Sequence, residues 1–487
     1  MKKFNVILAT DLDGGFGING ELPWDFTIDF AFFKSMTKSN SILPGINPAD
    51  NILIAGRKTW ESMGCNPLPG RKTFVVSSQW ELLSQTHLEQ KNTRNSRLYV
   101  PDKMLQIEFF PTFFSAYLAA SKFLNSDIWV IGGAQIYDTA LRHWACNQVY
   151  WTKIHGHFNT DVSIHMEKYP IEWTSQISTL DIDKKTGLAC TLEFKLGTQI
   201  PTTEAQYLST LYDVVTTGEK RQTRNAITWS KFTKTISCDL SNGFPLLTTK
   251  KMFWKGIVEE LLFFIRGETD TTKLSAQGVK IWEPNTSREF LDSVGLSYPD
   301  GHMGPMYGYQ WRHWGKPYLL DETSQTKGID QLAKVIGEIK SDPNSRRILM
   351  TDFNPTQAAQ GVLYPCHSIV IQFYVQENKL SCTMYQRSGD LFLGIPFNIA
   401  STSLLLHIMS KLTGLNPGTV NLVFGDYHVY DSHVSAVYEQ LERTPKDFPQ
   451  IIIPDFKTLD QVEQSKLSDY VLVDYKSDPA IKVSMIA

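Results

Sequence analysis

Two extended apolar segments in the C-terminal half, residues 363–371 and 380–388, constrain the fold of this chain more than any other feature. Both segments are rich in β-branched and aromatic residues, and the polar sequence Gln-Glu-Asn at 376–378 lies between them. This pattern predicts a β-hairpin. Such a hairpin would bring the thiol of Cys366 and the guanidinium of Arg387 onto one patch of sheet.

Cys366 is therefore a candidate nucleophile. The thiolate is the reactive form of cysteine, and a fixed cation nearby lowers the pKa of a thiol. The alternative is that Cys366 is a small buried residue of a strand. His367 is not an obvious base for this thiol, because consecutive residues of a strand point to opposite faces.

Length and composition set the broad class. A chain of 487 residues with 42% hydrophobic and 20% charged residues is expected to form two or three globular domains. A net charge of -3 gives no general attraction to nucleic acid or membranes, so an anion site would need a local arginine cluster. The six scattered cysteines lack zinc spacing, which predicts reduced thiols, no metal site and, without a signal-type or membrane-spanning segment, a soluble cytoplasmic protein.

Residues 1–197 alternate strand and helix patterns. A buried-type strand at 4–10 is followed by a glycine-rich loop, and a helix is predicted over 27–38. That helix places Asp29 on the same face as Phe33. An acid within an aromatic stripe could hold or relay a proton to a flat heterocycle, whereas the alternative is an ordinary first-turn acid that complements the helix dipole.

Two strand-to-helix turns in this region are suited to phosphate. The first follows the strand 51–55 and carries Arg57 and Lys58, and the second ends in Gly132 and Gly133. Helix N-termini with basic side chains bind phosphate, although adjacent glycines alone are equally explained by a tight packing turn. Together the turns predict a dinucleotide with an extra phosphate.

In order along 1–197, five motifs resemble dihydrofolate reductase. They are Leu-Pro-Trp at 22–24, Asp29 with Phe33, Gly-Arg-Lys-Thr-Trp-Glu-Ser at 56–62, Pro-Leu-Pro-Gly-Arg at 67–71 and Val-Ile-Gly-Gly at 130–133. The resemblance implies an α/β domain with a mostly parallel central sheet and flanking helices. Two departures are Ala134, where a third glycine is common, and an apparent surface insertion at 39–50.

The same resemblance implies dihydrofolate as substrate, NADPH as cofactor and no metal. Asp29 would anchor the pterin ring and assist its protonation, and Arg71 would hold the carboxylate of the folate tail. Other folate contacts would be Ala9, Phe33, Thr59, Met63 and Thr152. NADPH would lie on Gly56, Arg57, Lys58, Thr59, Ser77, Ser78, Gly132, Gly133 and Tyr137.

A short linker at 198–202 leads to a second domain, 203–487, that opens with a helix over 204–217. A strongly apolar helix at 252–265 contains Glu260. Its surroundings predict a partly buried carboxyl group with a raised pKa, and the alternative is a solvated edge residue such as Glu259.

Three further groups of polar residues stand out in this domain. Arg346 and Arg347 face opposite ways at the start of an extended segment, so they would serve one phosphate best if they crossed into the site of a second subunit; otherwise they form a solvated basic turn. Asn398 is either a helix cap or a reader of a pyrimidine edge. His428 and Tyr430 share a strand face and could meet a ribose, unless His428 is a core histidine.

Over 203–487 the motifs resemble thymidylate synthase, an α+β fold. They are Phe-Pro-Leu-Leu-Thr-Thr-Lys-Lys at 244–251, Pro-Cys-His at 365–367, Tyr-Gln-Arg-Ser at 385–388, Pro-Phe-Asn-Ile-Ala-Ser at 396–401 and Asp-x-His-x-Tyr at 426–430. The resemblance implies that Cys366 attacks C6 of dUMP. Methylenetetrahydrofolate would donate both carbon and hydride, leaving dihydrofolate, and the protein would be a homodimer through this domain.

Residue roles follow from the same resemblance. Glu260, Tyr307, His367 and Asn398 would act in catalysis beside Cys366, and Trp282 would contact the folate. The dUMP contacts would be Arg387, Ser388, Asp390, Asn398, His428 and Tyr430, with Arg346 and Arg347 from the second subunit. One departure concerns the family's Asp-Arg-Thr loop: Thr223 stands where the phosphate arginine belongs, with Arg224 one residue later. Either the loop shifts register so that Arg224 serves, or one contact is lost at a cost of about 1.5–3 kcal/mol.

The order of the two domains is similar to that of bifunctional dihydrofolate reductase-thymidylate synthases. We therefore predict an enzyme that makes thymidylate and recycles folate, with no membrane and no obligatory nucleic acid partner. The alternative is a dimeric nucleotide- or RNA-binding protein with a degenerate synthase half. The presence of Cys366, Glu260 and Asn398 favours the enzyme, because a binding protein has no need of a nucleophile.

Overall fold

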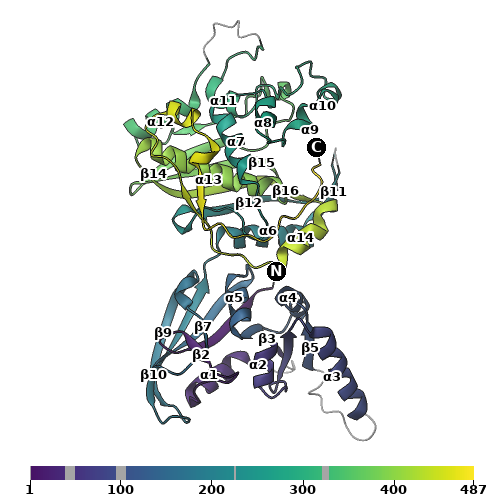
Figure 1. Cartoon of the computed structure of the whole chain (residues 1–487), viewed down its shortest axis with the longest axis vertical. Helices are drawn as coiled ribbons and strands as arrows, with labels where there is room; N and C mark the ends of the chain where they lie inside the picture. Colours follow the sequence, from purple (N-terminus) through teal and green to yellow (C-terminus); the bar gives the residue numbers. More distant parts are fainter. Residues whose placement is uncertain (1, 39–49, 95–105, 224–225, 321–327, 487) are drawn as a thin grey trace. The chain divides into compact units, whose positions relative to one another are not determined.

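The computed structural model describes residues 2–38, 50–94, 106–223, 226–320 and 328–486. Its contacts divide the chain into two compact units, Met1–Ala205 and Gln206–Ala487 (Figure 1). The proposed surface insertion lies almost wholly outside the described residues, as does Arg224.

The first unit is built on an eight-stranded sheet in the order β5-β4-β3-β6-β1-β7-β10-β9. Its strands are β1 (Phe4–Thr10), β3 (Asn51–Gly56), β4 (Arg71–Val76), β5 (Ile107–Phe110), β6 (Ile128–Gly132), β7 (Cys146–His155), β9 (Ile171–Ile182) and β10 (Ala189–Gln199). Pairing is parallel from β5 to β7 and antiparallel for β10 and β9. The predicted mostly parallel sheet is confirmed, and its central strands are buried along nearly their whole length, as parallel strands covered by helices are.

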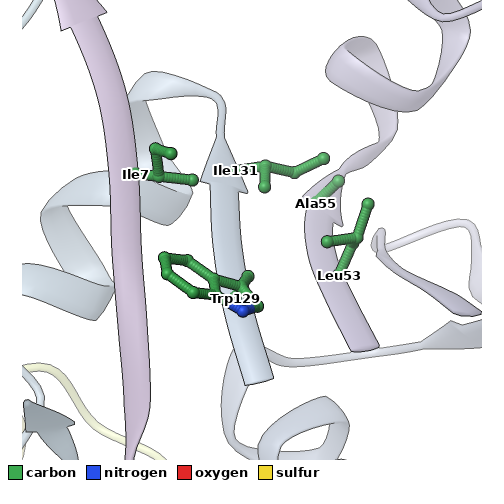
Figure 2. Packing of buried hydrophobic residues seen from close by; sticks show 5 residues of the cluster. All are labelled: Ile7, Leu53, Ala55, Trp129 and Ile131. Atoms are coloured by element: carbon green, nitrogen blue, oxygen red, sulfur yellow. The ribbon is translucent and has the colours of Figure 1, made fainter. Parts of the chain in front are cut away.

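Helices and a small hairpin surround this sheet. They are α1 (Thr27–Thr37), α2 (Arg57–Ser62), α3 (Trp80–Arg94), α4 (Phe113–Ser121), α5 (Ala134–Arg142), the 3-10 turn η2 (Met166–Lys168), and the paired strands β2 (Gly15–Gly17) and β8 (Val162–Ser163). A core cluster of Ile7, Leu53, Ala55, Trp129 and Ile131 projects from β1, β3 and β6 (Figure 2). The aromatic face of α1 packs against this cluster, which places the side chains of that face over the centre of the sheet.

The end of β10 overlaps the segment expected to be a linker. β10 continues to Gln199, which pairs with Ile171, and the Gln199 side-chain amide donates a hydrogen bond to the carbonyl of Leu141. Helix α6 (Thr203–Thr217) then begins, so only residues 200–202 connect these two elements.

The second unit contains a six-stranded mixed sheet in the order β11-β12-β16-β15-β14-β13. Its strands are β11 (Glu219–Gln222), β12 (Ile227–Asp239), β13 (Leu349–Met350), β14 (Val370–Gln376), β15 (Lys379–Asp390) and β16 (Asn416–Tyr430), and a separate pair is formed by β17 (Gln450–Ile452) and β18 (Val471–Val473). Only the pairing of β15 with β16 is parallel among the described strands of this sheet. Both strands therefore end at the same edge.

Helices cover the second sheet (Figure 1). They are α7 (Trp254–Ile265), α8 (Thr272–Ala276), α9 (Glu283–Thr286), α10 (Arg288–Ser293), α11 (Gly308–His313), α12 (Gln331–Ser341), α13 (Gly394–Thr413), α14 (Val434–Leu441) and α15 (Leu459–Glu463), with 3-10 turns η3 (Leu240–Asn242), η4 (Ala358–Gln360), η5 (Asp431–His433) and η6 (Leu467–Asp469). Helix α13 packs on β15 and β16, and α7 packs on α11 and α13. Within the described ranges, no helix is long and apolar enough to cross a bilayer.

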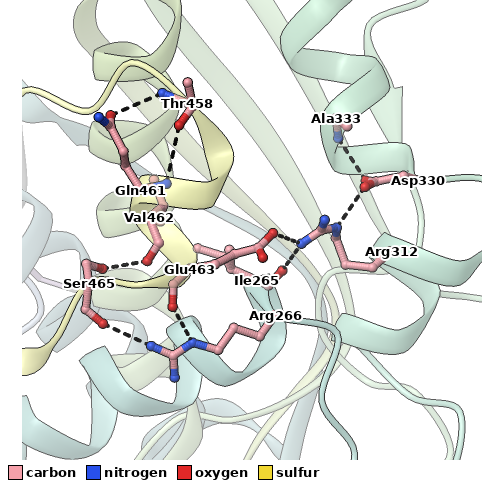
Figure 3. Close-up of polar contacts among 10 residues, drawn as sticks. All are labelled: Ile265, Arg266, Arg312, Asp330, Ala333, Thr458, Gln461, Val462, Glu463 and Ser465. Atoms are coloured by element: carbon pink, nitrogen blue, oxygen red, sulfur yellow. Dashed lines mark hydrogen bonds and ion pairs between the residues drawn. The ribbon is translucent and has the colours of Figure 1, made fainter.

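A polar network fixes the helices of the second unit to one another (Figure 3). The Arg312 guanidinium on α11 donates to Asp330 Oδ2 at 3.0 Å, to Glu463 Oε1 and to the carbonyl of Ile265. Asp330 also accepts from the backbone N–H of Ala333 at 2.9 Å and so caps α12. Because Arg312 is largely buried, these charged hydrogen bonds hold α7, α11, α12 and α15 in a defined arrangement.

Candidate active sites

The predicted hairpin is present, but Cys366 is not in its first strand. Strands β14 and β15 pair through a tight turn in which Glu377 and Asn378 have φ of 48° and 60°. Residues 363–369 are irregular instead of extended, and the prediction of a strand there is wrong. Pro365 has no N–H to pair, and Ser368 has a φ of 56° that a strand does not allow.

Arg387 holds this irregular segment against β15. The carbonyl of Cys366 accepts from the Arg387 backbone N–H at 2.8 Å, and Arg387 Nε donates to the carbonyl of Pro365 at 3.0 Å. Burial raises the pKa of the Cys366 thiol, a hydrogen bond from Tyr307 lowers it, the Asp352 carboxyl group raises it and Arg387 lowers it. The net shift is upward. Arg387 lowers the pKa of the thiol, as expected, but burial raises it by more.

Tyr307 and His367 form one side of the thiol site. The Tyr307 hydroxyl lies 3.4 Å from Cys366 Sγ, and the His367 ring stacks on the Tyr307 ring at 4.2 Å between centroids and 7° between planes. Burial lowers the pKa of His367 to about 4, so its imidazole is neutral at pH 7. His367 Nδ1 lies 2.9 Å from Ser368 Oγ, which fixes the orientation of the ring.

Tyr307 depends on a glycine for its place. It precedes α11 with a φ of 42°, and a Cβ atom on the next residue, Gly308, would overlap the backbone of Phe264 on α7. Only glycine allows α11 to begin so close to α7. The contact presses the Tyr307 ring against Phe264 at 5.1 Å between centroids.

Glu260 is the acid of this site. Its Oε1 accepts from Trp282 Nε1 at 2.8 Å, and burial raises the pKa of the carboxyl group to about 7. The Trp282 ring centroid lies 6.0 Å from that of Tyr307. The Trp282 indole therefore lies between Glu260 and the Tyr307 ring beside Cys366. The neighbouring Glu259 is only 7% exposed, and its description as a solvated edge residue is wrong.

The parallel ends of β15 and β16 gather another polar group. Ser388 lies opposite Asp426, and Asp390 lies opposite His428. His428 Nδ1 is 2.8 Å from Asp426 Oδ1, and its ring is 5.3 Å from that of Tyr430. The Asp390 carboxylate accepts from the backbone N–H groups of residues 392 and 393 at the start of α13, so it supports the turn into that helix.

Asn398 is not a helix cap. Helix α13 begins at Gly394, which places Asn398 in its second turn. Its Oδ1 accepts from Gln386 Nε2 at 3.1 Å. The Oε1 atom of Gln386 is buried and has no partner among the described residues. The sequence analysis gave Gln386 no role, although it is the second residue of the Tyr-Gln-Arg-Ser motif.

The predicted phosphate arginines are less closely gathered. Arg346 and Arg347 are exposed in the turn before β13, and in the described ranges no hydrogen bond joins them to the Cys366 segment. Arg221 on β11, which sequence reasoning also overlooked, places Nη1 at 4.0 Å from Asp426 Oδ2. A cation is therefore present beside the ends of β15 and β16, three residues before Arg224.

In the first unit, Asp29 occupies the first turn of α1. Burial raises its pKa to about 6, a hydrogen bond with the Thr152 side chain lowers it and the carboxylate of Asp181 raises it. Thr152 on β7 lies opposite Ala9 on β1, so these three predicted folate residues are neighbours. Asp29 is in the first turn of α1, where it also complements the helix dipole, and its raised pKa shows that the carboxyl group is desolvated.

Apolar and cationic groups lie near Asp29. Phe33 and Met63 both pack on the core cluster of Figure 2. Arg71 at the start of β4 is 4% exposed, and its Nη1 donates to Thr37 Oγ1 at 2.7 Å. Its Nε is buried and has no partner among the described residues. Arg71 therefore carries a donor whose hydrogen bond is not satisfied by the described residues.

The two glycine turns lie side by side, because Ala55 on β3 pairs with Gly132 on β6. A Cβ atom at Gly132 would lie 2.8 Å from the Tyr137 ring, and one at Gly133 would lie 3.2 Å from Thr59 Oγ1. Glycine at these positions therefore lets the two turns pack closely against side chains of α2 and α5.

The other predicted dinucleotide residues surround these turns. Lys58 is exposed, and Arg57 Nη1 pairs with Glu61 Oε1 at 2.7 Å. Ser77 is buried and Ser78 is exposed after β4, where Ser77 Oγ accepts from the backbone N–H of residue 79. The Tyr137 hydroxyl donates to the carbonyl of residue 7 at 2.9 Å, so its hydrogen bond is directed into the core.

Comparison with known proteins matches each unit. A family model described as dihydrofolate reductase matches residues 3–194, and one described as thymidylate synthase matches residues 205–487. The chain belongs to the bifunctional dihydrofolate reductase-thymidylate synthase family. A Paramecium tetraurelia member is 36% identical over 493 residues, covering 99% of both chains. Members from Zea mays and Leishmania major are 35% and 36% identical, covering 99% and 100% of this chain and 96% and 95% of their own. These full-length matches give no support to the alternative of a nucleotide- or RNA-binding protein.

Proposed function

We propose that this bifunctional enzyme makes thymidylate from dUMP in its second unit and reduces the resulting dihydrofolate in its first. The observation that carries the proposal is that the Tyr307 hydroxyl lies 3.4 Å from Cys366 Sγ. Glu260, whose pKa is raised, accepts a hydrogen bond from the Trp282 indole, and this indole lies next to the Tyr307 ring. Reductive methylation of a pyrimidine requires a nucleophile, a hydrogen-bond donor and an acid whose pKa is near 7.

In the synthase unit, the Cys366 thiolate attacks C6 of dUMP. The Tyr307 hydroxyl and Arg387 both favour the thiolate, which offsets part of the increase in thiol pKa that burial causes. Arg387 Nε and Nη2 bind backbone carbonyls, so Nη1 is directed to the phosphate beside Ser388. Arg346 and Arg347 of a second subunit add to this phosphate site, and Arg224 completes it if its loop shifts register.

The same unit recognises the base and moves protons. Asn398 Oδ1 is bound by Gln386, so the Asn398 amide is held in one orientation toward the uracil, with Asp390 supporting the turn. His428 and Tyr430 bind the ribose. At neutral pH Glu260 is present in both protonation states, since its pKa is about 7, and exchanges protons through water with His367 nearby. Methylenetetrahydrofolate, packed on Trp282, supplies the carbon and the hydride.

In the reductase unit, Asp29 holds the pterin and supplies a proton, because its pKa of about 6 keeps part of it protonated near neutrality. Phe33, Met63, Ala9 and Thr152 line the folate site, and Arg71 Nε binds the tail carboxylate. NADPH, when bound, supplies the hydride. The residues that bind it are those of the glycine turns and their surroundings, Gly56, Arg57, Lys58, Thr59, Ser77, Ser78, Gly132, Gly133 and Tyr137.

We also propose a homodimer formed through the second unit. Tyr374 and Tyr385 are exposed on β14 and β15, and they share a sheet face because Tyr374 lies opposite Ser381, four residues from Tyr385. Exposed aromatic side chains on a sheet face favour burial against a partner. The free cysteines favour a cytoplasmic location, and we assign residues 1–197 and 203–487 to the two activities.

Tritium release from dUMP labelled at C5, measured with methylenetetrahydrofolate, tests the synthase assignment. We expect release from the full chain, coupled to NADPH oxidation when NADPH is present. Bound dUMP without any release would overturn the assignment. NADPH oxidation started by dihydrofolate tests the reductase unit independently.

A further inference from the structure

Asp352 is a buried acid that the roles above do not use. It lies between β13 and β14 and is 1% exposed. Within the part of the chain that the structure describes, no other residue donates a hydrogen bond to either oxygen of its carboxyl group. An acid in this condition is costly as a carboxylate, so burial favours its neutral form.

The residues on either side of Asp352 attach it to the Cys366 segment. Thr351 Oγ1 donates to the carbonyl of Ile369, and the Phe353 ring lies 5.7 Å from that of Tyr364. These two contacts bracket Cys366 in sequence, so Asp352 is held beside the irregular segment that carries the thiol. Its carboxyl group is near enough to act electrostatically on Cys366 and on the Tyr307 hydroxyl.

The charged groups around Asp352 do not neutralise it. Burial raises its pKa well above the ordinary value, and its own backbone N–H opposes this only in part. Glu260 also acts on Tyr307 and adds negative charge when ionised. Burial lowers the pKa of His367, which stacks on Tyr307, so this ring is neutral, and Arg387 donates to the carbonyls of Pro365 and Tyr364 and not to Asp352. The surroundings of Asp352 therefore favour its neutral form.

We propose that Asp352 is a positioning residue for the synthase nucleophile: while protonated it permits the Cys366 thiolate to form, and when ionised it suppresses it. This proposal rests on the role assigned to Cys366 above. An ionised Asp352 and a Cys366 thiolate would be two negative charges in one poorly solvated site, so each disfavours the other. The ionisation of Asp352 at high pH therefore limits the pH range in which the Cys366 thiolate forms readily.

Alkylation of Cys366 by iodoacetamide tests the proposal without any turnover. Rates are measured from pH 6 to 10 in the full chain by peptide mass, with the exposed Cys65 as an internal reference. Asp352→Asn keeps the shape and removes the charge. We expect its Cys366 rate to match the wild type at low pH and to exceed it at high pH by about tenfold, the equivalent of one pKa unit. Rate profiles that stay parallel across the whole range would overturn the proposal.

Two further measurements separate this role from a structural one. The alkaline fall in tritium release should shift to higher pH in Asp352→Asn, while reductase activity in the same chain is unchanged. If Asp352→Asn does not fold, the infrared spectrum of Glu260→Gln protein at pH 8 should still contain the C=O stretch of a protonated carboxyl group. Its absence would contradict a neutral Asp352. Absence of tritium release from the wild type, with the expected difference between the wild-type and Asp352→Asn alkylation profiles, would instead count against the proposed function.

Discussion

The two units each contain an acid of near-neutral pKa, but they hold it in different ways. Asp29 occupies a regular position, the first turn of α1, above strands that pair in register. Glu260 is also on a helix, yet it reaches Cys366 only through Trp282 and Tyr307, and both Tyr307 and Ser368 have left-handed backbone. The reductase site is therefore an assembly of regular elements, whereas the synthase site depends on irregular backbone fixed by tertiary contacts. Substitutions in the two sites should therefore affect the two activities differently.

The sharpest test of two separate sites is Cys366→Ser. We expect tritium release to fall by about 10⁴-fold or more, because the hydroxyl is a far weaker nucleophile than a thiolate. NADPH oxidation by dihydrofolate should be unchanged. Cys65→Ser, at an exposed cysteine, is the matched control and should retain both activities. Loss of both activities in Cys366→Ser would refute independent sites.

Asp29→Asn should have the converse effect. Reductase activity should fall by roughly a thousandfold, since the amide cannot supply a proton, and tritium release should persist. In the wild type the proton is available below a pKa of about 6, so the reductase rate should fall as pH rises through that value and should lose this dependence in the variant. Asp13→Asn, at an exposed acid, is the control. A variant that keeps the pH dependence would exclude Asp29 as its source.

Glu260→Gln compares two adjacent acids of α7. Tritium release should fall by about a hundredfold, because a group that ionises near pH 7 is lost from the proton path. Glu259→Gln removes the same charge one residue earlier, where no contact leads to Cys366, and should change release by less than about threefold. Equal losses in both variants would mean that the helix, and not the Glu260 carboxyl group, matters.

Arg312→Met addresses the tertiary contacts on which the irregular site depends. Removing the guanidinium breaks its bonds to Asp330 and Glu463, and should destabilise the second unit by about 2 kcal/mol. Synthase activity should be lost at a lower temperature, while the temperature at which reductase activity is lost is unchanged. Lys334→Met, at an exposed pair on α12, should shift neither midpoint. Equal shifts in both activities would show that the units do not unfold independently.

The difference between the sites also explains what the sequence could predict. Asp29 with Phe33, and the glycine turns, follow from helix and strand periods and were placed correctly. The β14–β15 hairpin was likewise expected, but the irregular path of residues 363–369 was not: Pro365 is a local signal against a strand, whereas no residue type marks the positive φ of Ser368.

The sequence predicted the burial of some acids and not of others: a partly buried Glu260 was expected from its apolar surroundings, and its raised pKa agrees with this. Periodicity favoured exposure for Glu259, which the packing of α7 buries. The positions of Asp352 and Gln386 beside Cys366 and Asn398 depend on contacts between distant segments, which a linear sequence does not encode in any short motif.

The contact between Gly308 and Phe264 has a consequence for how this family can vary. Phe264 meets the glycine through its backbone, so this contact does not depend on which side chain Phe264 carries. Gly308 has no such freedom, because even a single added methyl group would force α11 away from α7 and carry Tyr307 away from Cys366. Inherited variation at this position should therefore abolish thymidylate synthesis in a protein whose reacting groups are all still present.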